Sequence, residues 1–272
     1  MTTGTKEWAE VNCNFQKGCR NNCVYCYAKA TAIRFGTSTP EGWEKPTISM
    51  PEHYPHGKLV MLPSSHDIDN RNIAAAKECI RELLKRDNRI LIVTKPNLST
   101  IGTLIRFLEK EGGRDYREKV SFRLTIGTAD DGMLQRFEPG TPTFHERFMA
   151  LRDLYIAKIP TGVSAEPLIG GIDTFDDLYL RVRKFMTGQI WVGRMNMPRQ
   201  RIRMNTEGTF DEKLIDWVIR KQSDEEMLKL YEKYRNDPKV AFKDSIATLI
   251  CKRNSNDGEK PDGEKENGEE RR

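Results

Sequence analysis

Residues 18–28 read GCRNNCVYCYA and place Cys19, Cys23 and Cys26 within eight residues of a chain that contains six cysteines. A chain of 272 residues can form a core without disulfides, so clustered cysteines indicate a metal site or a catalytic site. A zinc ribbon or finger would need a second cysteine pair, and the sequence contains none downstream. Three thiolates on one loop would leave a metal centre with an open position, as catalytic centres require. The alternative is a fully ligated zinc or cluster site in which Cys13 is the fourth ligand.

On both sides of this loop, short apolar runs alternate with helical patterns between residue 8 and about residue 196. Strands are expected at residues 8–15, 58–63, 89–94, 120–127, 161–169 and 189–196. Helices are expected at residues 27–35 and 72–86, around residues 104–108, and from the starts marked by Thr143 with Glu146 and by Thr174 with Asp177. This alternation predicts an α/β fold with a parallel sheet, either curled into a barrel or wound in both directions. No G-x-G-x-x-G or P-loop sequence follows a strand, which removes the main support for a dinucleotide site.

Beyond residue 205 the sequence suggests helices alone. Ser223 and Glu226 form a capping box, and the apolar residues between 242 and 250 suggest a last helix. Residues 252–272 combine charges of both signs with Gly, Pro and Asn and lack apolar side chains, which is typical of a disordered tail. The predicted domains are therefore a barrel at 1–205, a helical extension at 206–251 and a tail at 252–272.

The spacing Cys19-x3-Cys23-x2-Cys26, with Tyr25 just before the third cysteine, resembles the signature loop of the radical S-adenosylmethionine superfamily. The resemblance implies a partial (β/α)6 TIM-type barrel in which the three cysteines hold a [4Fe-4S] cluster. It also implies that S-adenosylmethionine chelates the open iron, and that its reductive cleavage yields a 5'-deoxyadenosyl radical that abstracts a hydrogen atom from the substrate. A reductant of the flavodoxin or ferredoxin type is the implied partner. The cofactor carries this chemistry, while the protein orients the reactants and excludes water.

Three stretches narrow the resemblance: the cysteine loop, VTKP at 93–96 and the segment at 137–171 are similar to the spore photoproduct lyase-related group, also called DNA repair photolyases. The similarity covers roughly residues 10–196. By this analogy Ser65, Lys95 and Thr125 contact the amino-acid part of S-adenosylmethionine, and Tyr25 lies near the adenine. Barrel geometry would place Ser164 and Glu166, on the fifth strand, at the same mouth.

Several of these residues also have a local explanation. Lys95 precedes a proline at a strand exit, where a solvated lysine is common. His66 and Asp67 either touch a ligand or cap the next helix, and Glu138 either binds a ligand or braces a loop. The remaining cysteines, Cys13, Cys79 and Cys251, are expected to be buried or inert thiols.

A few residues bear on the identity of the substrate. Photoproduct lyase carries a hydrogen-donating cysteine where this chain has Ser64, and a serine O–H is a far poorer hydrogen-atom donor, which argues against photoproduct repair. If residues 193–203 are extended, Arg199, Arg201 and Arg203 share one face and could bind phosphates, although a solvated edge explains them equally well. Trp191, Tyr27 and Trp43 either stack a base or pack against the barrel.

The composition sets outer limits on function. The net charge of +5 permits contact with a nucleic acid but is below the basic excess of a dedicated nucleic-acid-binding protein. No apolar run is long enough to span a membrane and the N-terminus has no signal-peptide pattern, so a cytoplasmic protein without membrane contact is expected. Two functions stay open: a radical S-adenosylmethionine enzyme acting on a nucleic acid, nucleotide or peptide, and a noncatalytic binding protein stabilised by zinc or an iron–sulfur cluster.

Overall fold

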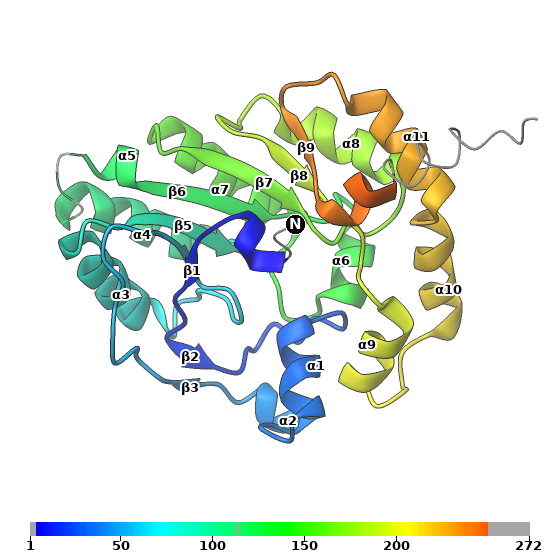
Figure 1. The fold of residues 1–272 in the computed structure, drawn as a ribbon, viewed down its shortest axis with the longest axis horizontal. Helices are drawn as coiled ribbons and strands as arrows, with labels where there is room; N and C mark the ends of the chain where they lie inside the picture. Colours follow the sequence, from blue (N-terminus) through cyan, green and yellow to red (C-terminus); the bar gives the residue numbers. More distant parts are fainter. Residues whose placement is uncertain (1–3, 112, 114, 250–272) are drawn as a thin grey trace, which may run out of the picture.

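The centre of the fold is a parallel sheet of seven strands, seen in Figure 1, in a computed structural model that describes residues 4–111, 113 and 115–249. Its strands are β1 (Val11–Asn12), β4 (Leu59–Leu62), β5 (Arg89–Thr94), β6 (Val120–Thr125), β7 (Thr161–Ala165), β8 (Ile190–Val192) and β9 (Val240–Phe242). The strands adjoin in the order in which they occur in the chain, as in barrels, and β1 and β9 are the edges. The predicted parallel α/β fold is confirmed.

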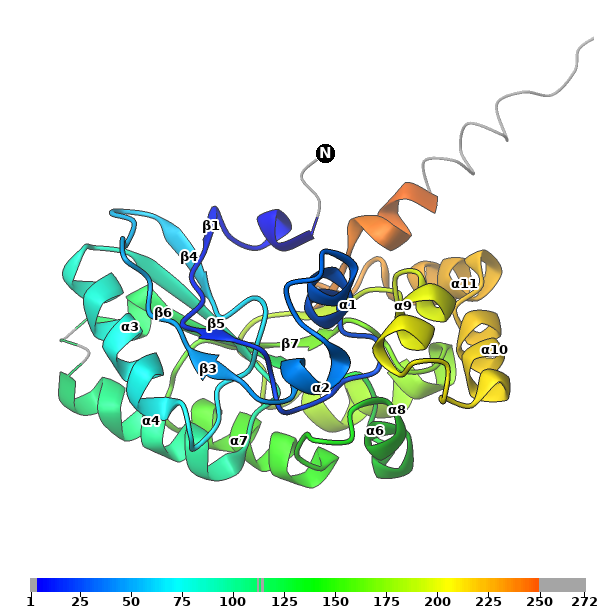
Figure 2. The ribbon, with the colours of Figure 1, turned by 90° about the horizontal axis from the view of Figure 1, so that it is seen from below.

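The long helices cover one face of this sheet. Figure 2 shows α3 (Ile73–Lys85), α4 (Leu98–Glu111) and α7 (Phe144–Ile156) along that face, and α8 (Ile172–Val182) continues the series. The shorter helices among these strands are η1 (Gly4–Glu7), α1 (Tyr27–Arg34), α2 (Pro40–Trp43), α5 (Tyr116–Lys119) and α6 (Asp131–Phe137). In the described part of the chain, no helix is both long and apolar enough to cross a bilayer.

The two faces of the sheet pack against different parts of the chain. Ile90 and Ile92 of β5 are fully buried in the large core that the outer helices complete. Leu91, between them, points to the opposite face because strand side chains alternate, and there it packs with Met61 and Ala9. The N-terminal segment therefore covers part of the inner face of the sheet.

Two of the elements predicted before residue 196 differ from the structure, and one predicted helix start is confirmed. The strand expected at residues 8–15 is split, because after β1 the chain turns into β2 (Gln16–Lys17), which pairs antiparallel with β3 (Thr47–Ile48). The capping box at the start of α7 is confirmed, with Thr143 and Glu146 bonded in both directions. The helix start at Thr174 is wrong, since the Phe175 N–H already bonds to the Gly171 carbonyl, 3.1 Å away.

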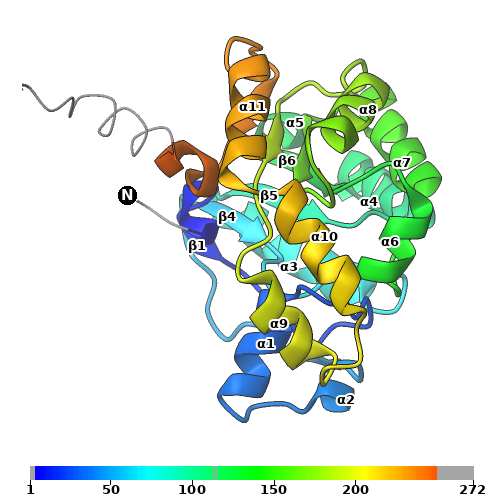
Figure 3. The same cartoon turned by 90° about the vertical axis from the view of Figure 1, so that its right-hand side faces the viewer.

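The arginine-rich segment at residues 193–203 is not extended, so the condition under which Arg199, Arg201 and Arg203 would share one face is not met. It forms α9 (Pro198–Asn205), in which Pro198 occupies the first turn, a position that favours proline because no N–H is needed there. Figure 3 shows α9 beside α1, and the two helices are in contact. The arginines therefore do not share one face.

The expectation of helices alone beyond residue 205 is also wrong. After α10 (Glu212–Lys221) and α11 (Asp224–Tyr234), β9 joins the sheet beside β8 as a seventh strand, and residues 244–249 are helical. Ser223 caps α11 as predicted, accepting the Glu226 N–H at 3.3 Å. Cys251 and the predicted disordered tail at 252–272 lie outside the described residues.

Candidate functional site

A cavity of about 880 Å³ lies where the predicted site residues meet, a size typical of small-molecule sites. Residues at the carboxyl ends of parallel strands converge at one mouth, so strand exits far apart in sequence reach the same space. All nine predicted site residues line this cavity: Cys19, Cys23, Tyr25, Cys26, Ser65, Lys95, Thr125, Ser164 and Glu166. Their individual roles remain predictions.

The cysteine loop is anchored by backbone contacts from distant segments. Cys26 caps α1, its sulfur accepting the Lys29 N–H at 3.4 Å. The amide of Asn205, at the end of α9, donates to the carbonyls of Val24 and Cys26, both at 2.9 Å. The Val24 N–H donates to the Phe137 carbonyl at 3.0 Å. No periodicity in the sequence indicates this role of Asn205, because its partners lie 181 and 179 residues away in the sequence.

The thiols of this loop are suited to a cationic centre. Burial, together with the charge of Asp67, raises the pKa of Cys19 to about 12, and burial raises the pKa of Cys23. Such thiols become thiolates only when a cation compensates their charge, as a bound metal does. The residues present therefore fit a metal centre by the chemistry of their donor atoms.

The positions of the cysteines bear on the alternative of a single, fully ligated metal ion. Across residues 4–249, leaving aside 112 and 114, no three His, Cys, Asp or Glu side chains are grouped so that they could hold a single metal ion. Ligands of one tetrahedral zinc ion must lie close together, whereas thiolates of a cubane bind different iron atoms and are more widely spaced. Cys13, the alternative fourth ligand, is buried in the main core and hydrogen-bonds Cys79. Cys13 does not line the cavity that the other three cysteines line, which argues against Cys13 as a fourth ligand.

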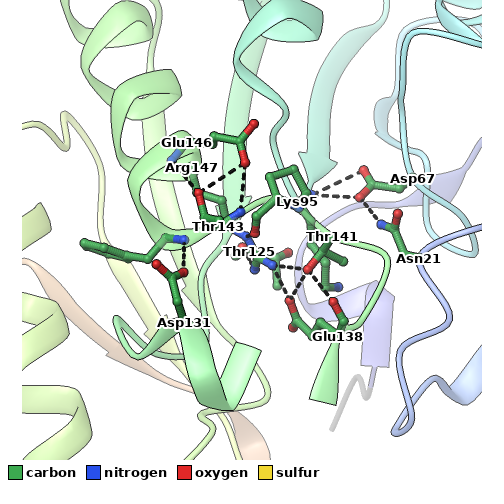
Figure 4. Close-up of polar contacts among 12 residues, drawn as sticks. Asn21, Asp67, Lys95, Thr125, Asp131, Glu138, Thr141, Thr143, Glu146 and Arg147 are labelled. Carbon is green, nitrogen blue, oxygen red and sulfur yellow. Dashed lines mark hydrogen bonds and ion pairs between the residues drawn. The ribbon is translucent and has the colours of Figure 1, made fainter. Parts of the chain in front are cut away.

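A buried ion pair supports the wall of the cavity. Glu138 and Arg147 are both fully buried and their charged groups lie 2.6 Å apart, in the cluster that Figure 4 shows beside Lys95. The hydroxyl of Tyr25 donates to the Glu138 carboxylate. Burial alone would raise the pKa of Glu138, but Arg147 and Lys95 outweigh it and hold that pKa below its ordinary value. Glu138 thus braces the loop, the second of its two predicted explanations.

Asp67 connects the exits of two strands to the cysteine loop. Its carboxylate accepts the Lys95 N–H at 3.2 Å and the Asn21 amide at 2.6 Å, as Figure 4 shows. It also accepts the Ile68 N–H at 2.8 Å and the Thr94 hydroxyl. It does not cap α3, whose cap residue is Asn72. The contacts fix the position of Lys95 at the cavity.

The ammonium group of Lys95 carries its charge without a close carboxylate. Burial alone would lower the pKa of Lys95, but Cys23, Glu138 and Asp67 together raise it. In the part of the chain that the structure describes, its Nζ makes no hydrogen bond or ion pair and lies 5.7 Å from the centre of the Tyr25 ring. A cation placed in this way is available for an anionic ligand.

Several buried polar atoms at the cavity lack protein partners among the described residues. Both ring nitrogens of His66, Oγ of Ser164 and Nε1 of Trp8 are buried without a hydrogen bond, and all three residues line the cavity. Buried polar groups in native proteins are almost always paired with protein, water or ligand. These atoms mark the cavity as a place for a ligand with polar groups.

The three aromatic residues considered for base stacking lie in different surroundings. Tyr27 lines the cavity and its hydroxyl donates to the Ser64 carbonyl at 2.6 Å. Trp43 is buried, and Trp191 packs edge-on against Trp8 with ring centres 6.2 Å apart. Packing therefore explains Trp43 and Trp191.

His66 predicts a measurable dependence of stability on pH. Burial lowers the pKa of His66 from 6.5 to about 4. The unfolded chain therefore binds a proton near pH 6.5 that the folded chain resists, so stability falls as pH decreases through this window. His66 alone should contribute a loss of about 2 kcal/mol between about pH 7 and pH 5. Urea unfolding at the two pH values should show a smaller difference for His66→Gln.

The exposed His145 of α7 provides the control. His145→Gln should keep the full pH difference of the unmodified protein. An equal pH difference in His66→Gln and the unmodified protein would contradict the burial of a neutral imidazole.

A known structure shares the fold of this chain, but no relative is found by sequence. No protein-family model and no curated protein sequence matches the chain. SuiB of Streptococcus suis bound to the precursor peptide SuiA matches with a TM-score of 0.52 and 9% identity, over 89% of this chain and 50% of that chain. SuiB bound to S-adenosylmethionine gives a TM-score of 0.49 and 10% identity, over 86% and 46% of the two chains. The structure of SuiB alone gives a TM-score of 0.48 and 10% identity, over 85% of this chain and 47% of the SuiB chain. The chain spans about half the length of the SuiB chain, and the match at 0.52 shows a shared fold.

Proposed function

We propose that this chain is a radical S-adenosylmethionine enzyme whose Cys19, Cys23 and Cys26 hold a [4Fe-4S] cluster. The observation that carries the proposal is the convergence of these cysteines and the six predicted cofactor residues on one cavity. SuiB, whose fold the chain shares, has been solved bound to S-adenosylmethionine. The cluster, when bound, would supply the one-electron chemistry that cleaves S-adenosylmethionine.

The residues of the chain would bind and orient the cofactor. Lys95 pairs with its carboxylate, since an ammonium group without a protein carboxylate suits an anionic partner. Ser65, Thr125 and the unpaired hydroxyl of Ser164 hydrogen-bond its polar groups. Glu166 is partly engaged already, because its carboxylate lies 3.6 Å from Lys243 Nζ.

The proposal is tested by anaerobic reconstitution with iron and sulfide. A brown protein that converts S-adenosylmethionine to 5'-deoxyadenosine when dithionite is added would support it. One equivalent of zinc without cleavage would support the alternative, a noncatalytic metal-stabilised binding protein.

Lys95 gives a prediction on binding alone. Lys95→Gln should weaken S-adenosylmethionine binding by about 10- to 100-fold, the effect of losing a charge-assisted hydrogen bond. Equilibrium dialysis of the cluster-loaded protein measures it. Lys85→Gln, at an exposed ion pair on α3, is the control and should bind normally. Equal affinities of the two variants would show that Lys95 does not hold the cofactor.

The proposal leaves a nucleic acid, a nucleotide or a peptide as substrate classes, and a flavodoxin or ferredoxin as the reductant. SuiB has been solved with a precursor peptide, which supports including a peptide. Membership of the spore photoproduct lyase-related group rests on the sequence resemblance. Photoproduct repair is not proposed, because Ser64 stands at the donor position. The five described cysteines are free thiols, which suits the reducing cytoplasm.

A further inference from the structure

The three arginines of α9 have different surroundings. Arg199 and Arg203 are one helical turn apart, and both pair with Glu212, at 2.7 Å and 2.6 Å. Arg201 lies on the opposite side of the helix, because two residues span about 200° of a helix. It lines the cavity. Among the described residues it has no hydrogen-bond partner and no carboxylate within ion-pair distance.

Arg201 stands beside the cysteine loop. α9 packs on α1, and the side chains of Cys26 and Tyr27, which begin α1, are the titratable groups near the guanidinium. Burial of the guanidinium is the main reason why the pKa of Arg201 is lowered. An arginine that is partly removed from water without a counter-charge is unfavourable in the free protein, and a bound anion would relieve that cost.

The other charges of the cavity are largely committed to protein partners. The cavity is lined by five cationic side chains and two carboxylates: Lys6, Lys95, Arg194, Arg201 and Lys243, with Asp67 and Glu166. Lys243 pairs with Glu7 at 3.0 Å, and Arg194 pairs with Asp224 at 2.5 Å. Because Lys6 is exposed and Lys95 is assigned to the cofactor, Arg201 is the partly buried cation left for another ligand.

We infer that Arg201 binds an oxyanion of the substrate, a phosphate or a carboxylate, at the side of the cavity next to the cysteine loop. That the anion belongs to a substrate rests on the proposed function, whereas the presence of an anion site at Arg201 does not depend on it. A guanidinium presents two parallel N–H donors to an oxyanion, which fixes orientation as well as position. Arg201 would therefore hold the substrate in a defined orientation beside the cofactor.

The experiment follows the arginine Nε–H signals of the full-length protein by NMR. The signal lost in Arg201→Gln is assigned to Arg201, and the signal lost in Arg199→Gln provides the matched control on the same helix. Inorganic phosphate and acetate are titrated separately at constant ionic strength held by chloride. The Arg201 signal should shift and saturate, while the Arg199 signal should not.

Each outcome decides the inference. Arg201→Gln should weaken binding of the preferred anion, measured by calorimetry, by about tenfold or more, because a charge-assisted contact is lost. Stronger binding of phosphate indicates a phosphate-bearing substrate, and stronger binding of acetate indicates a carboxylate. Equal behaviour of the two arginine signals would overturn the inference. Displacement of the anion by S-adenosylmethionine would also overturn it, because Arg201 would then belong to the cofactor site.

A failure of the proposed function would look different. The reconstituted protein would then not cleave S-adenosylmethionine, while saturable anion binding at Arg201 would persist.

Discussion

Replacing Cys23 with serine is expected to abolish both cluster loading and the formation of 5'-deoxyadenosine. Cys23 is the middle ligand of the proposed three, and only 8% of the residue is exposed. A serine hydroxyl of nearly the same size preserves the packing but does not ionise to give a soft thiolate ligand. Two thiolates would remain, too few to hold a cubane with one open iron. Iron and sulfide per chain, and 5'-deoxyadenosine per chain under dithionite, measure the two losses.

Cys79 provides the matched control for this substitution. It is a buried thiol whose partners are Cys13 and the hydroxyl of Tyr54, 3.5 Å away, and it is not part of the cavity wall. Cys79→Ala should keep its iron and its cleavage activity. Thermal unfolding of the Cys23→Ser protein checks that the fold is intact. Cleavage at the normal rate in a folded Cys23→Ser protein would refute the proposed role of the loop.

Local spacing explains why the candidate site could be predicted from the sequence. The three cysteines are neighbours in the chain, so their grouping needs no tertiary information. Ser65, Lys95 and Ser164 sit at or near the exits of parallel strands, and those exits converge in any α/β barrel. The strand pattern therefore predicted a common location, while the chemical roles came only from the resemblance.

The supporting contacts could not be predicted in the same way. Asn205 reaches the cysteine loop across almost the whole barrel, and Arg147 reaches Glu138 from the next helix. Neither pairing follows a helical or strand period, so no local pattern indicates it. β9 was missed because three residues are too few to show an alternation.

For the arginine segment, the sequence left open whether the chain is extended. A period of two is informative only if the segment is extended, and Pro198 starts a helix there instead. Proline in the first helical turn is a recognised start signal, and Pro198 favours a helix over an extended segment here. The helix separates Arg201 from Arg199 and Arg203, and the inferred anion site depends on that separation.

Substitution of Arg147 by methionine is expected to lower the free energy of unfolding by about 3–5 kcal/mol, because it leaves the buried Glu138 carboxylate without its closest counter-charge. Arg147 also donates to the Pro142 carbonyl at 2.9 Å and to the Thr125 carbonyl at 3.2 Å. Methionine fills much of the same volume but replaces none of these donors. Urea unfolding at neutral pH measures the loss.

Two further variants separate the cost of a stranded charge from the loss of packing. Arg181→Met breaks an exposed ion pair with Asp177, in which each side chain is 53% exposed, and should cost less than about 1 kcal/mol. Combining Arg147→Met with Glu138→Gln removes the stranded carboxylate, so the double variant should be more stable than Arg147→Met alone. If Arg147→Met costs no more than Arg181→Met, the buried pair does not hold the cavity wall. Because the Thr125 carbonyl is a partner of Arg147, the same substitution should also loosen the wall of the cavity where the cofactor is proposed to bind.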